Sequence, residues 1–303
     1  MPGVRWILPV AAVAAVLAMG TAAAQTSEDA TNAPQFPTAR FAEGANKASV
    51  TSDGVTATLR LDRGATPDPS KDKVFLNISV GLMPVAQTSL PDSGLTPPET
   101  EASIANIDPG NHYPEVYFSA YTGGAHCCTN VVVAEERPYG WVTVKVGEFD
   151  GDGGYLQDID HDGLAEIVTV DNRFLYTFDC YACSAAPLRI FTVRAGAVVD
   201  VSTDPRYLPA HRDWLAQLDQ SVDPSTRWTS AGFLAGWVAE KIRVGEGADA
   251  WKELKAHWNY AQDPGEETCL TGGDLDTCPK GQKKVLKFPD RLKLFLDQNG
   301  YGT

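Results

Sequence analysis

The strongest local signal in this sequence is the nonapeptide Asp158-Ile159-Asp160-His161-Asp162-Gly163-Leu164-Ala165-Glu166. Its carboxylates fall at positions 1, 3, 5 and 9, and the glycine at position 6 permits a sharp turn. Ca²⁺ takes about six to eight oxygen ligands in flexible geometry, so these side chains and the backbone carbonyl of Leu164 can converge on one ion. Without a cation, clustered carboxylates repel one another. The pattern therefore predicts one calcium site.

The residues after this loop indicate which kind of calcium loop it is. An EF-hand loop needs a bidentate Glu at its twelfth position, and that position is Thr169 here. Thr169 lies within residues 166–170, an apolar run that predicts a β-strand. The loop is therefore the shorter type, which leads directly into a strand.

Residues 158–170 resemble the calcium loop of FG-GAP and VCBS repeats, the blade units of integrin-type β-propellers. The resemblance implies one Ca²⁺ and five ligands, which are the side chains of Asp158, Asp160, Asp162 and Glu166 and the carbonyl of Leu164. A degenerate copy lies earlier in the chain, where Ile107-Asp108-Pro109-Gly110 precedes Glu115-Val116. It lacks the alternating aspartates, so we expect no strong metal site there.

Short strand-like segments recur around this loop, with apolar alternation and turn dipeptides between them. They cover residues 55–61, 74–80, 115–120, 130–134, 141–146, 166–170, 173–178, 188–193 and 197–201, with loops at 64–72 and 89–101. A closed propeller needs about four to eight four-stranded blades, more than these strands can supply. We therefore predict an α+β fold that is predominantly antiparallel β. Its two or three blade-like meander sheets do not form a closed propeller, and a C-terminal helical region follows.

The apolar spacing becomes helical after about residue 204. We expect helices over residues 208–222, from Asp223-Pro224 to a stop at Gly245 and Gly247, around 251–258, and after Pro289. The tryptophans of this region are expected to form the helix-to-sheet core, not a ligand platform. They are Trp214, Trp228, Trp237, Trp251 and Trp258.

The amino-terminal end has the layout of an export signal. Arg5 precedes an apolar stretch that is too short to span a bilayer, and small residues end it at Ala24. We predict a signal peptide at 1–24, a flexible leader at 25–47, a β-rich FG-GAP/VCBS-like region at 48–203 and a helical region at 204–303. The expected location is periplasmic or extracellular, with no membrane insertion after cleavage. The formal net charge of −14 also argues against a nucleic-acid partner.

Six cysteines in an oxidising compartment indicate three disulfides. They are Cys127, Cys128, Cys180, Cys183, Cys269 and Cys278. Cys269 and Cys278 form the easiest pair. The other four leave two alternatives open: each neighbouring pair closes on itself, or Cys127 and Cys128 bridge to the later pair. A zinc site built from the four thiolates and a redox role for the CxxC motif are weaker alternatives.

The string Gly123-Gly124-Ala125-His126-Cys127-Cys128 is the second unusual cluster. It resembles strings in bacterial secreted proteins, a resemblance that brings no known activity. His126 is the one candidate for a general base or metal ligand, with a neighbouring cysteine as nucleophile. We prefer the interpretation of a disulfide-stapled bend, and expect the remaining histidines to lie at the surface or to be satisfied by neighbours.

These features favour an exported, calcium-stabilised, disulfide-stapled binding or structural module, whose partner would be a protein or glycan of the cell envelope. The sequence contains no GxSxG elbow, no HExxH and no phosphate-binding glycine loop, so an enzyme is not favoured. The alternative is a secreted hydrolase that uses His126 with a carboxylate such as Asp108 or Asp179 and holds a structural calcium ion.

Overall fold

The computed structural model describes residues 35–62, 73–91, 94–95, 97–124, 127–151 and 153–302, without the side chain of Cys127. The predicted signal peptide, residues 25–34 of the predicted leader and His126 lie outside the described residues. No helix within the described ranges is long and apolar enough to cross a membrane.

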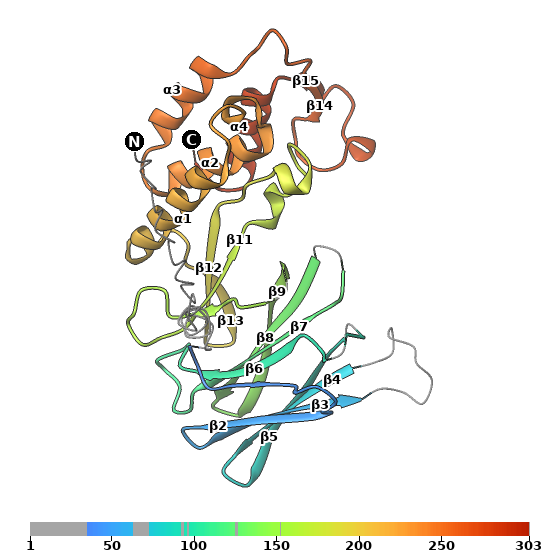
Figure 1. Ribbon diagram of the computed structural model, residues 1–303, viewed down its shortest axis with the longest axis vertical. Coiled ribbons are helices and arrows are strands. Elements are labelled where there is room, and N and C mark those ends of the chain that lie inside the picture. Colours follow the sequence, from blue (N-terminus) through green and yellow to red (C-terminus); the bar gives the residue numbers. More distant parts are fainter. Residues whose placement is uncertain are drawn as a thin grey trace, which may run out of the picture. The chain divides into compact units, whose positions relative to one another are not determined.

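Three antiparallel sheets follow one another along the chain (Figure 1). The first contains β2 (Lys47–Ser52), β3 (Val55–Asp62), β4 (Lys73–Val80) and β5 (Met83–Pro91). The second adds β1 (Thr38–Arg40) to the edge of β6 (Thr100–Ala105), β7 (Glu115–Tyr121), β8 (Cys127–Arg137) and β9 (Gly140–Asp150). The third contains β10 (Leu156–Gln157), β11 (Glu166–Val170), β12 (Leu188–Arg194) and β13 (Ala197–Asp200). The first and third sheets are four-stranded meanders, and the second is a four-stranded meander with β1 added at its edge. None of the sheets formed by described strands closes into a barrel or propeller. The predicted fold class is confirmed.

Strand β7 explains why the second sheet is buried on both faces. Val116 and Phe118 pack into a cluster with side chains of the first sheet, such as Leu76. Tyr117, between them, points the other way and packs with Ile167 of the third sheet. Successive side chains of a strand face opposite sides, so one apolar run serves two cores. The second sheet is therefore the layer that joins the first and third sheets.

Part of the predicted leader is a strand. Thr38–Arg40 pairs with β6 in antiparallel register, and Thr38 is hydrogen-bonded to Ser103, with 2.7 Å between their hydroxyl oxygens. Arg40 forms an ion pair with Glu101. The expectation of a flexible segment over residues 38–40 was wrong, because a three-residue strand is too short to show alternation.

Residues 173–178 are not a strand either. Asp171 accepts a hydrogen bond from the backbone N–H of Arg173 at 3.1 Å and so caps a short 3₁₀ helix, η2 (Asn172–Phe174). Tyr176 then adopts a left-handed backbone with φ of 63°. The aromatic residues that suggested a strand are instead used for the helical core, where Phe174 and Phe178 both pack edge-on against Phe295.

The carboxyl-terminal third is helical with one added hairpin. Its helices are α1 (Leu208–Ser221), α2 (Ala231–Arg243), α3 (Gly247–His257) and α4 (Phe288–Gln298). The five tryptophans lie in or against their common core, as predicted. In Figure 1, α1 and α2 gather beside β11 and β12, where Trp214 donates to the carbonyl of Ala186 at 3.0 Å.

Two features of this region differ from the prediction. Asp223 accepts from the N–H of Ser225 at 2.8 Å in a local turn, so α2 starts only at Ala231 and not at Pro224. The hairpin of β14 (Glu266–Cys269) and β15 (Lys283–Leu286) was not predicted. Its strands are short and largely exposed, so they carry no apolar alternation.

Candidate functional site

The loop between β10 and β11 brings three predicted ligands together. Oxygen atoms of Asp158, Asp160 and Glu166 all lie within 4.8 Å of one another. The three carboxylates come from the first, third and ninth positions of the nonapeptide. A single cation of moderate size can therefore touch all three.

Backbone hydrogen bonds shape the loop. The two side-chain oxygens of Asp158 accept from the N–H groups of Asp162 and Gly163, each at 3.1 Å. Gly163 has a φ of 88°, the left-handed conformation that glycine adopts without steric cost. His161, with a φ of 61°, shares that conformation and is exposed. The spacing of the aspartates thus builds the turn as well as the carboxylate cluster.

Glu166 is the buried member of the cluster, with 3% of its surface exposed. One carboxylate oxygen accepts from the N–H of Ile159 at 3.3 Å and the other from the hydroxyl of Tyr207 at 3.0 Å. Burial raises the pKa of Glu166 to about 7; the two hydrogen bonds oppose this shift, while the charges of Asp160 and Asp162 add to it. The three carboxylates thus carry an excess of negative charge, which a bound cation would offset.

Arg206 provides some positive charge from outside the loop. Its guanidinium lies 3.6 Å from a carboxylate oxygen of Asp162 and 3.9 Å from one of Asp160, and it also pairs with Asp204 at 3.0 Å. The other oxygen of Asp162 accepts from the N–H of Leu164 at 2.8 Å. Asp162 is not a member of the three-residue group, because its carboxylate faces this arginine at the rim.

The donor set suits a hard cation. All three grouped ligands are carboxylates, which favour Ca²⁺, Mg²⁺ or Mn²⁺ over soft metals. Ca²⁺ needs further oxygens, which Asp162, the carbonyl of Leu164 and water can supply. The residues present therefore fit calcium.

The loop between β6 and β7 occupies the same position in the second sheet. Here Glu115, 1% exposed, accepts from the N–H of Ile107 at 2.6 Å. Glu166 makes the same bond to Ile159, so the internal similarity seen in the sequence has a structural counterpart. The amide of Asn111 donates to Glu115 at 2.7 Å and to the buried Glu135 at 3.3 Å. In this copy an amide lies between the carboxylates.

The two disulfides whose partners are both described join cysteines that are close in sequence. Cys180 is bonded to Cys183, and Cys269 to Cys278, as the sequence suggested for the latter pair. Cys128 is also disulfide-bonded. The bridge from Cys127 and Cys128 to the later pair is therefore excluded, and so is a zinc site of four thiolates, since no described cysteine is free.

The two carboxylates considered as partners of His126 have other contacts. Asp108 accepts from the N–H groups of Gly110 at 3.0 Å and Ala195 at 2.9 Å. Asp179 accepts from the N–H of Cys180 at 2.8 Å and is exposed. Both carboxylates thus stabilise turns of the backbone.

A buried ionisable pair was not expected from the sequence. His211 and Glu240 are 2% and 0% exposed, and the imidazole Nδ1 lies 2.7 Å from a carboxylate oxygen. The Nε2 lies 2.8 Å from the carbonyl of Ser202, and the second oxygen of Glu240 accepts from the N–H of Leu188 at 3.0 Å. The pair fastens α1 and α2 to the third sheet. No spacing rule joins residues 29 positions apart on different helices.

A groove of about 600 Å³ adjoins the carboxylate loop. Asp160 and His161 line one side, and Asp213, Trp214 and Gln217 of α1 line the other. It therefore combines a half-buried indole with planar polar side chains.

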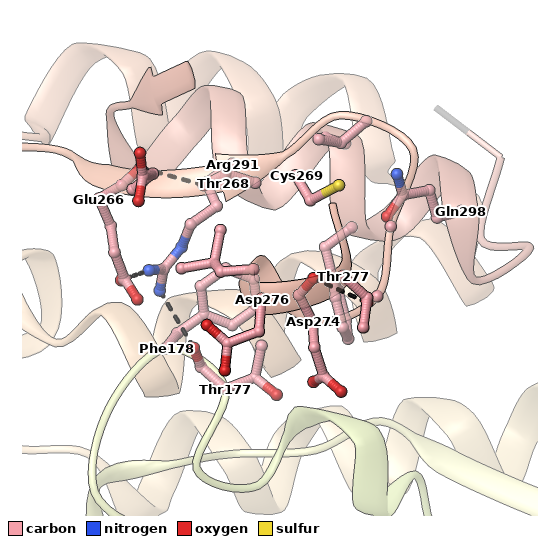
Figure 2. Close-up of a pocket in the computed structure, with 16 residues that line it drawn as sticks. Thr177, Phe178, Glu266, Thr268, Cys269, Asp274, Asp276, Thr277, Arg291 and Gln298 are labelled. Carbon is pink, nitrogen blue, oxygen red and sulfur yellow. Dashed lines mark hydrogen bonds and ion pairs between the residues drawn. The ribbon is translucent and has the colours of Figure 1, made fainter. Parts of the chain in front are cut away.

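A larger cavity, of about 970 Å³, lies between β14, the 272–277 loop and α4 (Figure 2). Arg291 crosses it, pairing with Glu266 and donating to the carbonyl of Thr177 at 3.1 Å. Its guanidinium lies over the ring of Phe178, 4.7 Å from the centroid. Figure 2 also shows the carboxylates of Asp274 and Asp276 on the loop that bounds the cavity. The arginine is neutralised within the wall, so its charge is not free for an anion.

Fold and site together define an α+β protein with stacked meander sheets and one carboxylate loop. Residues 211–300 match the family model described as the sll0997 C-terminal domain. The chain is 38% identical over 202 residues to a probable thylakoid lumen protein, sll0997, of Synechocystis, covering 65% of this chain and 59% of that protein. It is 30% identical over 207 residues to the uncharacterized protein y4bJ of Sinorhizobium fredii, covering 66% of this chain and 32% of that protein.

The chain thus spans less than two thirds of the length of either relative. No solved structure matches it. Neither relative's description mentions FG-GAP or VCBS repeats, so that kinship stays a resemblance carried by the residues of the loop.

Proposed function

We propose that this protein is an exported binding module, stabilised by one calcium ion at Asp158, Asp160 and Glu166. The convergence of these three carboxylates carries the proposal. Export is supported by the signal-like first 24 residues and by the lumenal location in the description of one relative. Local disulfides are consistent with an oxidising compartment.

The place of the ion suggests what calcium would stabilise. Tyr207, which donates to Glu166, ends the 3₁₀ helix η4 (Pro205–Tyr207), and α1 begins at the next residue. Arg206 of the same turn faces Asp160 and Asp162. A bound cation would neutralise the loop and hold it against the start of α1. Calcium would therefore stabilise the junction between the third sheet and the helical region.

The groove beside this junction is the ligand-binding surface of the proposal, and a glycan is the ligand class that its chemistry favours. Sugars stack an apolar face on an aromatic ring and exchange hydrogen bonds with planar amide and carboxylate groups. Trp214 packs against the helical core but also lines this groove, so in this proposal it would offer the ring, beyond the purely core role expected from the sequence. Gln157, Asp213 and Gln217 would offer the polar groups. The fixed carboxylate loop would position one wall of the groove.

The calcium part is tested by thermal unfolding of the exported protein with and without Ca²⁺. Ca²⁺ at about 100 times its Kd should stabilise the wild type by about 2.7 kcal/mol. That corresponds to a rise in Tm of roughly 4–5 °C for a chain of this size. The double variant Asp158→Ala, Asp160→Ala should lose the response. Asp249→Ala, which removes an acid from the first turn of α3, is the matched control and should keep it. A double variant that still responds like the wild type would refute the calcium site.

The ligand part is tested separately by binding to an array of bacterial and plant glycans in calcium-containing buffer. Substitution of the exposed Asp213 and Gln217 by Ala should abolish binding while the calcium response persists. Absence of binding by the wild type to any glycan would reject the ligand class without touching the calcium site. The mass of the exported form reports cleavage after Ala24.

A further inference from the structure

The disulfide between Cys180 and Cys183 lies in the segment that connects β11 to β12. Cys180 and Cys183 flank the two residues Tyr181 and Ala182, and both cysteines are exposed, as is the neighbouring Asp179. An attacking thiolate must approach a disulfide sulfur directly, so access is the first requirement for exchange. This bridge meets that requirement at both ends.

The bridge adds little as a structural staple. It joins residues separated by three positions, and the entropy that a crosslink removes from the unfolded chain grows with loop length. The turn is already closed by other bonds: the N–H of Cys183 donates to the carbonyl of Cys180 at 3.0 Å, and the N–H of Ser184 donates to that of Tyr181 at 3.0 Å. The side chain of Ser184 adds a third bond, to the carbonyl of Cys180 at 2.9 Å.

Packing holds the turn in position independently of the sulfurs. A Cβ added to Gly232 of α2 would lie 2.6 Å from the carbonyl oxygen of Cys183, and one added to Gly236 would lie 2.3 Å from that of Ala185. The segment thus rests directly on a glycine face of α2. The hydroxyl of Tyr181 donates to Asp150 at the end of β9. The two thiols would therefore stay close together after reduction, as rapid re-oxidation requires.

The Cys269–Cys278 bridge provides an internal contrast. It joins residues nine positions apart, and Cys269 is only 4% exposed in the core of its hairpin. This bridge closes the 270–277 loop that bounds the cavity in Figure 2, and so fixes structure. The two bridges differ in access, loop length and surroundings, and only one of them is placed for exchange.

From these contrasts we propose that Cys180 and Cys183 form a reversible redox site that exchanges disulfides with cysteine pairs of other exported proteins. A thiolate of the partner attacks one of the two sulfurs, and the other sulfur leaves as a thiolate that takes up a proton. The partner's second thiolate then attacks the mixed disulfide. The partner loses two electrons and two protons and gains a disulfide, while Cys180 and Cys183 become a dithiol.

A surface for such a partner lies beside the bridge. Thr177 and Phe178, just before the CxxC turn, line the 970 Å³ cavity on the loop drawn below it in Figure 2. Tyr176 is 63% exposed and its ring lies 5.4 Å from that of Tyr181. A peptide that reaches the bridge would pass over this aromatic pair.

The first test measures reduction in the native full chain. Dithiothreitol is added in graded amounts, free thiols are alkylated, and the cysteine peptides are quantified by mass spectrometry. Cys180 and Cys183 should be reduced at least about tenfold faster than Cys269 and Cys278, with the near-ultraviolet circular dichroism unchanged. Equal resistance of the two bridges, or loss of the tertiary signal on reduction of the CxxC bridge, would overturn the proposal.

The second test measures exchange with a reduced peptide that contains two cysteines, in the presence of oxidised glutathione. The wild-type protein should accelerate oxidation of the peptide at least about tenfold over the glutathione background. The variant Cys180→Ser, Cys183→Ser should give the background rate, and the control Asp249→Ala, in the first turn of α3 and outside the cavity, should retain the wild-type rate. No acceleration by the wild type, or equal acceleration by the CxxC double variant, would contradict a redox role. The reduction kinetics of the wild type decide the question even if a variant fails to fold.

Discussion

The buried pair of His211 and Glu240 gives the sharpest test of how the helices are attached to the third sheet. Both nitrogens of the imidazole face acceptor oxygens, so a proton must lie in each contact. Replacing Glu240 with Ala removes the acceptor of Nδ1 and the acceptor of the Leu188 N–H together. Each buried group left without a partner costs about 1–3 kcal/mol. The expected loss in the free energy of unfolding is about 3–5 kcal/mol, the range for breaking a buried pair.

Glu240→Gln is the matched variant. The amide oxygen can still accept from Leu188, and the amide nitrogen can donate to Nδ1 of a neutral His211, whose Nε2–H keeps its bond to Ser202. Only the second hydrogen of the new amide lacks a partner, so the loss should stay below about 2 kcal/mol. Urea unfolding followed by tryptophan fluorescence measures both losses, since five tryptophans lie in or against the helical core. Equal losses in the free energy of unfolding for Glu240→Ala and Glu240→Gln would refute this account of the contact. A loss below about 1 kcal/mol for Glu240→Ala would refute it as well.

Three further predictions concern the same region. Tyr301→Phe removes a hydroxyl that donates to Asp171 at 2.8 Å, and should lower the free energy of unfolding by about 1.5–3 kcal/mol in urea titrations. Burial disfavours the charge of Asp171, but the bonds from Arg173 and Tyr301 outweigh it and lower the pKa of Asp171. The ionised Asp171 therefore contributes its full stabilisation above the ordinary carboxyl pKa of 3.8, and this stabilisation is lost as pH falls through its lower pKa in the folded protein. The variant Asp171→Asn should consequently show a weaker dependence of stability on pH below 3.8 in acid unfolding. Gly236→Ala should cost about 1–3 kcal/mol in a thermal scan, because the backbone of Ala185 cannot yield to the new methyl group; a stable variant would show that α2 does not rest on that segment.

Strands whose apolar residues alternate were the most predictable part of the fold. The fully buried β6 and the preceding β5 were not predicted, and their ends lie within the loop expected at residues 89–101. β11 begins and ends where the sequence indicated, at Glu166 and Val170, because a turn glycine and an apolar run mark its limits. Strands β3 and β4 also matched, since their apolar residues alternate against one core. The hairpin β14–β15 was not predicted, because its side chains are mostly exposed and an exposed strand does not require alternating apolar residues.

Two further local predictions were wrong, each for its own reason. In residues 173–178 the aromatic side chains face a helical core that lies far along the chain, so their β propensity was overridden by tertiary packing. Asp223-Pro224 has the composition of a helix start, but Asp223 is used in a turn with Ser225. The sequence correctly indicated that Asp223 accepts a backbone hydrogen bond, but this bond closes a turn and does not mark the start of α2.

The carboxylate loop was predictable because its ligands are adjacent in sequence. The nonapeptide predicted four converging acids, of which Asp158, Asp160 and Glu166 lie together, whereas Asp162 faces Arg206. The contacts of Arg206 and Tyr207 with this loop could not be predicted, because they come from a turn that the fold brings back after β13. The spacing of residues in sequence can predict ligands within one loop, but not contacts with residues that the fold brings in from elsewhere.

The paired loops of the second and third sheets carry one more implication. Asn111 gives Glu115 and Glu135 a hydrogen-bond donor from within their own loop, whereas Asp160 and Glu166 of the equivalent loop are contacted by Arg206 and Tyr207 from outside it. Under the proposed calcium binding, the β6–β7 loop would be insensitive to divalent cations and the β10–β11 loop would respond to them. The two similar loops would then differ in their response to divalent cations. Only the attachment of the helical region to the third sheet would weaken when these cations are scarce.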